Sequence, residues 1–391
     1  MKSFRLACLL AAALSVGATS ALAQPASKIK IGLVSTLSGP NGALGEEIRD
    51  AFNLAVQLNG GSLGGVPVEV LVADDQFNPQ VGKQLFERMV KRDKVDFMTG
   101  VVFSNIMLAG LPEAVNEKVF YISPNAAPSP LAGKDCNPFF FVASWPNDAY
   151  HEMAGQHSTV RGFKSAYLLA PNYQAGKDFV AGFKRFYKGE VIDEIYTPLN
   201  QPDFAAELAQ VAAKKPDAVY VFYPGGLGVN FVRQYQQAGL LGKIPLLSTS
   251  TTDGSTLPAQ GEAALGVVSG TFWGPDFNNP ASKRFVDEFE AKFKRIPSQY
   301  AAQSYDAAQL LDSAIGKVKG NVADKNAFRA ALKAADFQSV RGSFKFNSNH
   351  FPIQDQHIFE VAKDAKGRVS LKTVATPLKN HGDAYAPLCK M

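Results

Sequence analysis

The sequence predicts an α/β protein with two lobes, each built on a mostly parallel sheet flanked by helices. Three observations lead to this prediction. Apolar strand-like segments alternate with amphipathic helical ones over residues 28–143, and the same alternation starts again at residue 165. The chain has 391 residues, which is long for one hydrophobic core and sufficient for two. Alternation of this kind is typical of parallel sheets with right-handed crossovers.

The first run of alternating elements begins with the apolar strand at residues 28–35 and a loop rich in Gly and Pro. Ile48, Phe52 and Ala55 then recur at helical spacing, which predicts an amphipathic helix. The predicted strands of this run are residues 28–35, 66–73, 95–98, 119–123 and 139–143, and the predicted helices are residues 46–58, residues 78–92 and a segment from residue 104.

The second run repeats the pattern without a literal sequence repeat. Its predicted strands are residues 165–170, 191–196, 218–223, 244–247 and 266–272, and its helices are residues 176–187, 203–213 and 227–238. Three further helices are predicted at residues 281–293, 301–318 and 324–334, before an ending rich in hairpins.

Three breaks in the pattern predict where the chain crosses between the lobes. They lie at Trp145-Pro146, at Trp273-Gly274-Pro275 and near residues 350–352. Three crossing segments would form a hinge. The first lobe would then comprise residues 24–144 and 275–351, and the second lobe residues 145–274 and 352–391.

The N-terminus has the pattern of a signal peptide. Lys2 and Arg5 precede an apolar run at residues 6–16, and the segment ending at Ala23 has the small-x-small pattern of a signal peptidase site. We therefore expect residues 1–23 to be removed and the mature protein to reside in the periplasm. No later apolar run approaches the roughly 18 to 20 residues that a membrane-spanning helix needs.

Charge argues against a nucleic-acid partner. The formal net charge is +5, and charges of both signs are spread without long runs of one sign. Interleaved basic and aromatic patches are missing.

Two cysteines, Cys136 and Cys389, remain once the signal peptide is removed. In an oxidising compartment an even pair favours a disulfide. This bond would tie the C-terminal tail, which would otherwise fray, to a loop in the first third of the chain.

Enzyme signatures are missing from the sequence. It lacks a P-loop, a GxGxxG loop and a GxSxG elbow, so we expect no enzymatic activity and no cofactor. His151, Glu152 and His157 have the wrong spacing for a zinc helix, and we interpret them as solvated helix surface rather than a metal site. Asp74 and Asp75 follow a strand and are interpreted as capping and turn residues.

The segment from residue 95 to residue 130 predicts an anion site. Two strands end there, and Ser104 has the chemistry of a helix N-cap, so the first amides of its helix would point into the same place. In the proline-rich loop that follows, Asn125, Ala126 and Ala127 would be consecutive amide donors. Ligands of open α/β sheets bind at such strand ends.

Several fragments carry a family resemblance. They are IGLVSTLSGPNGALGEE, VEVLVADDQFNPQ, GVVFSNIMLAGLPEA, VFYISPNAAPSPL and LLAPNYQAGKDF. In this order they resemble the periplasmic binding proteins of ABC importers, in particular the branched-chain amino-acid binding family with its type I fold. The resemblance covers essentially the whole mature chain. It implies a ligand held between the lobes and a permease as partner.

The resemblance also implies residue roles. In similar proteins that bind α-amino acids, a Ser at the helix start and an SPxAT loop hold the carboxylate, and an acidic residue of the second lobe holds the ammonium. Ser104 matches the first element, whereas Ala127 stands where a Thr is expected. The place of the acid falls within residues 248–251, which offer hydroxyls and no charge, with Asp253 close by.

A pocket without that acid should reject an ammonium group, because burying an unpaired charge costs several kcal/mol. We therefore expect a small carboxylate with a neutral remainder, and nearby aromatic residues favour an aromatic acid such as a benzoate or phenylpropanoid. The predicted ligand contacts are Leu37, Phe103, Ser104, Asn125, Ala126, Ala127, Tyr173, Tyr223, Ser250, Thr251 and Trp273.

The predicted function is capture of this ligand by a monomeric binding protein that delivers it to a membrane permease. Three alternatives stay open. A binder of branched-chain amino acids would use Asp253 as the missing acid, and a ligand sensor would present the same lobes to a receptor. An exported hydrolase is the third.

Overall fold

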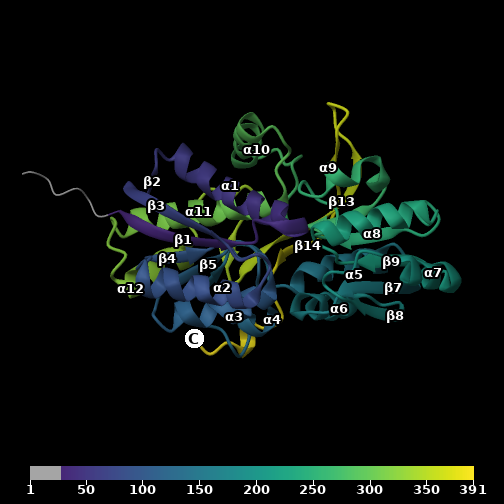
Figure 1. The fold of residues 1–391 in the computed structure, drawn as a ribbon, viewed down its shortest axis with the longest axis horizontal. Coiled ribbons are helices and arrows are strands. Elements are labelled where there is room, and N and C mark those ends of the chain that lie inside the picture. Colours follow the sequence, from purple (N-terminus) through teal and green to yellow (C-terminus); the bar gives the residue numbers. More distant parts are fainter. Residues whose placement is uncertain (1–27) are drawn as a thin grey trace, which may run out of the picture.

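The computed structural model describes residues 28–391, which form two lobes lying side by side, each on its own β-sheet (Figure 1). The predicted signal peptide and its cleavage site lie outside the described residues. The predicted α/β architecture of two helix-flanked sheets is confirmed.

The first lobe is organised by a six-stranded sheet, parallel except for the short strand β2 at one edge. In spatial order its strands are β2 (Ser62–Leu63), β3 (Val66–Asp74), β1 (Ile29–Ser35), β4 (Phe97–Thr99), β5 (Phe120–Ser123) and β6 (Phe140–Val142). The central strands are buried on both faces, as expected for a sheet covered by helices on both sides.

Two apolar clusters cover the two faces of this sheet. Phe52, Leu310 and Phe328 belong to one, and Phe86 and Ile106 belong to the other. The helices of this lobe are α1 (Gly42–Leu58), α2 (Pro79–Glu87), α3 (Ser104–Val115), α4 (Ser129–Ala132), α10 (Pro280–Phe293), α11 (Gln299–Lys317) and α12 (Lys325–Ala334). A π-helical turn, η2 (Arg88–Arg92), extends α2 over most of the predicted helix 78–92.

The second lobe is organised by an eight-stranded sheet whose order again requires crossovers. Its path is β12 (Lys345–Phe346), β13 (Pro352–Lys363), β11 (Val268–Thr271), β10 (Leu246–Thr249), β9 (Ala218–Val221), β7 (Ser165–Pro171) and β8 (Glu190–Thr197), with β14 (Val369–His381) paired to β13. The strands from β11 to β8 are parallel, whereas β13 is antiparallel to its neighbours. The predicted C-terminal hairpin is β13 and β14.

Helices cover both faces of the second sheet as well. Phe179 and Phe183 of one helix pack on one face, and Leu208, Phe231 and Tyr235 pack on the other. The helices are α5 (Ala149–Val160), α6 (Gln174–Phe186), α7 (Ala205–Lys214), α8 (Gly226–Gln237) and α9 (Leu257–Gln260), with short turns η1 (Gly39–Asn41), η3 (Gly261–Ala264) and η4 (Ala386–Leu388) elsewhere.

The C-terminal tail returns to the first lobe after β14. The predicted disulfide between Cys136 and Cys389 is present, with 5.7 Å between the two Cα atoms. Asn349 Nδ2 also donates to both oxygens of Asp383, at 3.1 Å each. The tail is thus a further connection between the lobes, beyond the three predicted crossings, and the predicted domain boundaries stay a prediction.

Over residues 28–391, no helix combines the length and the apolar character that crossing a membrane requires. In the same part of the chain, no three His, Cys, Asp or Glu side chains lie together as potential metal ligands.

Candidate ligand-binding cleft

A cavity of about 30 Å³ lies between the lobes, beside the N-terminus of α3. Six of the predicted ligand contacts line it, namely Phe103, Ser104, Asn125, Ala126, Tyr173 and Ser250. Its other lining residues include Trp145, Asn147, Tyr150, His151, Phe222 and Tyr300, which were not predicted. The two lobes therefore contribute to one site.

Ser104 lies at the helix start, although it is not the N-cap. Phe103 occupies the cap position and Ser104 is the first residue of α3, so the predicted N-cap role of Ser104 is wrong. The Ser104 Oγ instead accepts a hydrogen bond from Asn147 Nδ2, at 2.9 Å. Because the oxygen accepts in this contact, the Ser104 hydroxyl can donate its proton to a ligand oxygen. The first backbone hydrogen bond of α3 is donated by the Ile106 amide to the Phe103 carbonyl at 3.1 Å, so the amides of Ser104 and Asn105 precede it and lie at the positive end of the helix dipole.

The prediction of three free consecutive amides in the second loop is wrong. The amide of Ala126 donates to the carbonyl of Val101 at 3.3 Å, and the amide of Ala127 donates to Asn147 Oδ1 at 3.2 Å. The loop after β5 folds back onto the loop after β4, and this contact engages the Ala126 amide within the protein. The second donor pairs with a side-chain oxygen that could be exchanged for a ligand oxygen.

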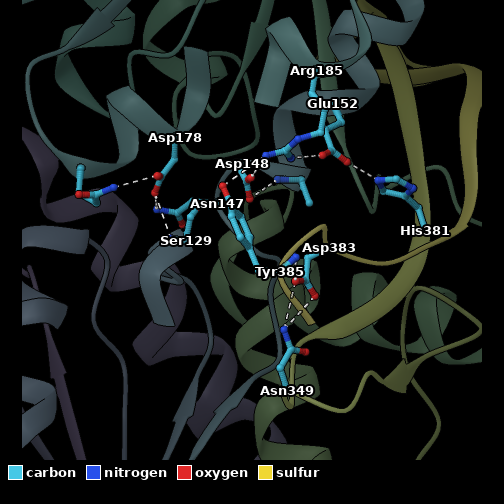
Figure 2. A network of polar contacts seen from close by, with 12 residues as sticks. Ser129, Asn147, Asp148, Glu152, Asp178, Arg185, Asn349, His381, Asp383 and Tyr385 are labelled. Carbon is cyan, nitrogen blue, oxygen red and sulfur yellow. Dashed lines mark hydrogen bonds and ion pairs between the residues drawn. The ribbon is translucent and has the colours of Figure 1, made fainter. Parts of the chain in front are cut away.

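Asn147 joins this end of the cleft to Asp178 of α6, a residue of the second lobe (Figure 2). Asn147 Nδ2 lies 3.0 Å from Asp178 Oδ2, which also accepts from the amide of Ser129 at 3.3 Å. Burial raises the pKa of Asp178. Sequence reasoning missed both side chains; the only signal was their place in the SWPND and QAGKDF segments.

Aromatic rings form the walls of the cavity. Tyr173 and Phe222 lie nearly parallel, with 6.3 Å between their centroids, and Phe103 lies 6.5 Å from Tyr173. Trp145 stacks on Tyr150 with a centroid separation of 4.2 Å. Such surfaces suit a flat apolar ligand.

A polar triangle links the lobes behind these rings. Tyr150 Oη donates to Gln299 Oε1 at 2.5 Å, and Gln299 Nε2 donates to Ser250 Oγ at 2.8 Å. Ser250 has φ 51°, a left-handed conformation that places its side chain in this triangle at a cost in backbone strain. Tyr150 and Ser250 belong to the second lobe, whereas Gln299 begins α11 of the first.

His151 and Glu152 are buried, so their interpretation as solvated helix surface is wrong. Burial lowers the pKa of His151 to about 3, which makes the imidazole neutral at physiological pH. Glu152 pairs with Arg185 and with His381 of β14 (Figure 2). The inward face of α5 thus carries buried polar side chains, which the spacing of these residues in the sequence did not reveal.

Five predicted contacts do not line the cavity, and one of them is Ala127, whose amide pairs with Asn147 Oδ1. Tyr223 accepts from Thr197 at 3.1 Å within the second-lobe core, and Thr251 Oγ1 accepts from the amide of Tyr223 at 2.8 Å. The indole of Trp273 packs in the first-lobe core, and the amide of Leu37 donates to Asp74. Each side chain follows a strand end, but the local chain direction takes it into a core or a loop.

Asp253 does not line the cavity either. Its Oδ1 accepts from the amide of Ser255 at 2.7 Å and from the Ser255 hydroxyl at 2.5 Å. Burial raises the pKa of Asp253. A salt bridge from Asp253 to a ligand ammonium would require this turn to rearrange.

Two helix-flanked sheets, joined by crossings and enclosing a cavity at strand ends, define a two-lobed solute-binding protein. The chain belongs to the periplasmic binding protein family, whose model matches residues 28–367. This family serves ABC transporters as substrate-binding proteins, and its members are not enzymes, which confirms the predicted class of protein.

Relatives of known structure or name are similar over nearly the whole chain. A solute-binding protein of an ABC transporter from R. palustris, solved in complex with benzoate, is 32% identical with a TM-score of 0.88 and covers 93% of this chain and 100% of its own. One from Rhodopseudomonas palustris BisB5, in complex with 3,4-dihydroxybenzoic acid, is 28% identical with a TM-score of 0.83 and covers 91% and 99%. A Leu/Ile/Val-binding protein homologue of Brucella melitensis is 26% identical and covers 95% and 97%.

Proposed function

We propose that this protein captures a small aromatic carboxylate between its lobes and delivers it to an ABC permease. The observation that carries the proposal is the make-up of the cavity. One end has the Ser104 hydroxyl and the amides at the start of α3, and the walls are aromatic rings. A carboxylate can bind the donors while its ring packs against the walls.

The absence of charge in the lining supports an acid rather than an amino acid. None of the described residues that line the cavity is Asp, Glu, Lys or Arg, and its one histidine is neutral. A ligand ammonium would be buried there without a direct partner, at a cost of several kcal/mol. The benzoate and 3,4-dihydroxybenzoic acid complexes of the two similar proteins support the same ligand class.

The size of the cavity indicates how the ligand enters. A volume of about 30 Å³ has room for one or two water molecules, not for an aromatic ring. The lobes or the aromatic side chains must therefore separate before binding. In the same step a ligand oxygen would replace Asn147 Oδ1 at the amide of Ala127. Ligand binding then exchanges an internal contact for a charge-assisted one.

The proposal also includes export of the protein to the periplasm and an ABC permease as its partner. Cleavage after Ala23 would release the mature chain, as a monomer, into the periplasm, where the closed form would meet the permease at the inner membrane. A mass of purified periplasmic protein that corresponds to Gln24 as first residue would support the cleavage site, and any other N-terminus would exclude it.

A thermal-shift screen of the mature protein tests the proposed function. Benzoate, 3-phenylpropanoate, aliphatic acids and the three branched-chain amino acids would be compared at equal concentration, with titration calorimetry on each ligand that raises Tm. We expect the aromatic acids to raise Tm most, because a ligand that binds only the folded form stabilises it. A rise with amino acids and none with aromatic acids would overturn the proposal.

Binding of a zwitterionic amino acid is the second candidate, and Asp178 is the observation that favours it. This carboxylate shares Asn147 with Ser104, so it lies one side chain away from the anion end of the cleft. If Asn147 moved, Asp178 could receive an ammonium.

Asp178→Asn separates the two candidates. For an aromatic acid we expect equal or tighter binding, because a nearby negative charge is removed. For an amino acid we expect a loss of about tenfold or more, because a charge partner is lost. Asp287→Asn, an exposed residue of α10, is the matched control for the change in net charge.

A further inference from the structure

His151 is a polar group in the cavity that the carboxylate end does not use. It lies on α5 of the second lobe, while the anion donors belong to α3 of the first. Its ring packs edge-on against Tyr150, Phe179 and Phe222, with centroid separations of 5.1 to 5.3 Å. These contacts fix the plane of the imidazole.

Two hydroxyl groups form hydrogen bonds with one nitrogen of this ring. Nδ1 lies 2.8 Å from Thr249 Oγ1 and 2.9 Å from Tyr220 Oη. Both residues sit on buried parallel strands, β10 and β9, so the anchor is rigid. The imidazole is held by strand residues rather than by a loop, which is how a recognition group is kept in place.

His151 lines the cavity, and its other ring nitrogen, Nε2, can form a hydrogen bond with a ligand there. Within residues 28–391, both side-chain hydrogen bonds of His151 are made at Nδ1, which leaves Nε2 for a ligand. The neighbouring hydroxyls of Tyr150 and Ser250 are already engaged with Gln299. A ligand that fills the cavity without a polar group at this wall would bury Nε2 unpaired, which is unfavourable.

We propose that His151 Nε2 pairs with a hydroxyl on the ligand ring, so that the site prefers hydroxylated aromatic acids to unsubstituted ones. This inference rests on the proposed function and names its substrate class more closely. A phenolic hydroxyl both donates and accepts, so it pairs with Nε2 in either tautomer of the neutral imidazole. Binding sites that hydrogen-bond a ligand hydroxyl discriminate strongly against the analogue that lacks it.

Titration calorimetry of the mature protein with benzoate, 3-hydroxybenzoate and 4-hydroxybenzoate tests the inference. We expect at least one hydroxybenzoate to bind about tenfold or more tightly than benzoate, since an unpaired buried nitrogen has a cost of this order. The ratio of the two Kd values is the readout, because it cancels general effects on folding or closure.

A pair of substitutions isolates the ring nitrogen. In His151→Asn an amide takes the place of Nδ1 and keeps its two hydroxyl partners, but nothing remains at Nε2. In His151→Gln the amide extends to the place of Nε2. We expect the hydroxyl preference to fall to within about twofold in the Asn variant and to survive in the Gln variant. His157→Asn, on the same helix but outside the cavity, is the matched control.

The outcomes are distinguishable. Equal affinity for benzoate and both hydroxybenzoates in the wild type, or an unchanged preference in His151→Asn, would overturn the role of His151 while leaving the proposed function intact. Failure of every aromatic acid to bind would overturn the proposed function itself. Circular dichroism of both variants checks that each is folded.

Discussion

Ser104 places a hydroxyl where helix amides and the cleft meet, and its contact within residues 28–391 is one in which the oxygen accepts from Asn147. Ser104→Ala should weaken the binding of carboxylate ligands about tenfold or more, because a hydrogen bond to a charged group is worth about 1.5 to 3 kcal/mol. Titration calorimetry with the tightest ligand found in the screen measures this loss.

The control for Ser104 is another buried helix serine. Ser158 of α5 donates to the carbonyl of Ala154 at 2.8 Å and does not line the cavity. Ser158→Ala should leave the affinity within about twofold. If both variants bind as the wild type does, Ser104 is not part of the anion site.

Asp75 gives a stability prediction at the same scale. It is fully buried after β3, and burial raises its pKa to about 6 although Thr36 and the amide of Phe77 donate to it. The folded protein holds the proton of Asp75 more tightly than the unfolded chain does. The stabilisation is therefore complete below about pH 4 and is lost as the pH rises through about 6.

Asp75→Asn should remove this loss. Above pH 7 we expect the variant to be more stable than the wild type by about 3 kcal/mol, and near pH 4 the two should be similar. Urea unfolding at both pH values measures the difference. Exposed Asp287→Asn should show no such dependence; a variant of Asp75 that is less stable at both pH values would contradict the assignment.

Among the elements, the C-terminal tail after β14 contains the short turn η4 and is held by contacts with other segments of the chain. The disulfide, the contact between Asn349 and Asp383, and the hydrogen bond between His381 and Glu152 hold it across both lobes, and Figure 2 shows the last two contacts. These contacts lie on either side of the crossing that leads into α5. The tail therefore restrains the same region that supplies Asn147 and His151 to the cleft.

Cys136→Ser should lower the free energy of unfolding by about 2 to 4 kcal/mol, because the bond closes a loop of 253 residues in the unfolded chain. Thermal unfolding of the variant and of wild type with and without reductant measures this. Reductant should destabilise the wild type and leave the variant unchanged. Equal Tm values for all samples would show that the bond does not form in solution.

Sequence periodicity predicted the strands and helices well, because each depends on a local apolar pattern. It failed for the inward face of α5. His151 and Glu152 are polar and lie on a weakly amphipathic helix, so they resemble a solvated surface. Glu152 is covered by His381, which lies far along the chain, and His151 faces partners on two strands of the second sheet. Burial of this kind is decided by tertiary packing, which no local window contains.

For the whole molecule, binding depends on how closely the lobes approach. Between the lobes, the start of α8 meets the turn η1, which precedes α1. A Cβ at Gly226 would lie 2.9 Å from the Cβ of Pro40, which leaves no space for a larger side chain. A side chain there would act as a wedge between the lobes.

Gly226→Leu should therefore weaken ligand binding about tenfold or more while leaving the fold intact, since it penalises the closed form only. Calorimetry gives the affinity, and small-angle scattering should show a smaller ligand-induced decrease in the radius of gyration. Ala209→Leu, which adds bulk to an exposed position of α7, is the control. Wild-type affinity in Gly226→Leu would mean that this contact is not made in the bound state.

The ligand site could be predicted only in part, because some of its contacts form between the two lobes. Ser104 and Tyr173 follow strand ends of single lobes, and the topology rule for open sheets places them at the ligand. Asn147 lies in a crossing segment, and its contacts with Ser104 and Asp178 exist only when both lobes are in place. Contacts made by closure have no signature in either half of the sequence.

The bond between Cys136 and Cys389 turns most of the protein into a covalent ring that contains every segment joining the two sheets. A protease that cuts one of these segments would produce two polypeptides that still migrate together on a gel until a thiol is added. The disulfide would hold the two polypeptides of such a cleaved molecule together, so both lobes would stay in place and could still close around a ligand.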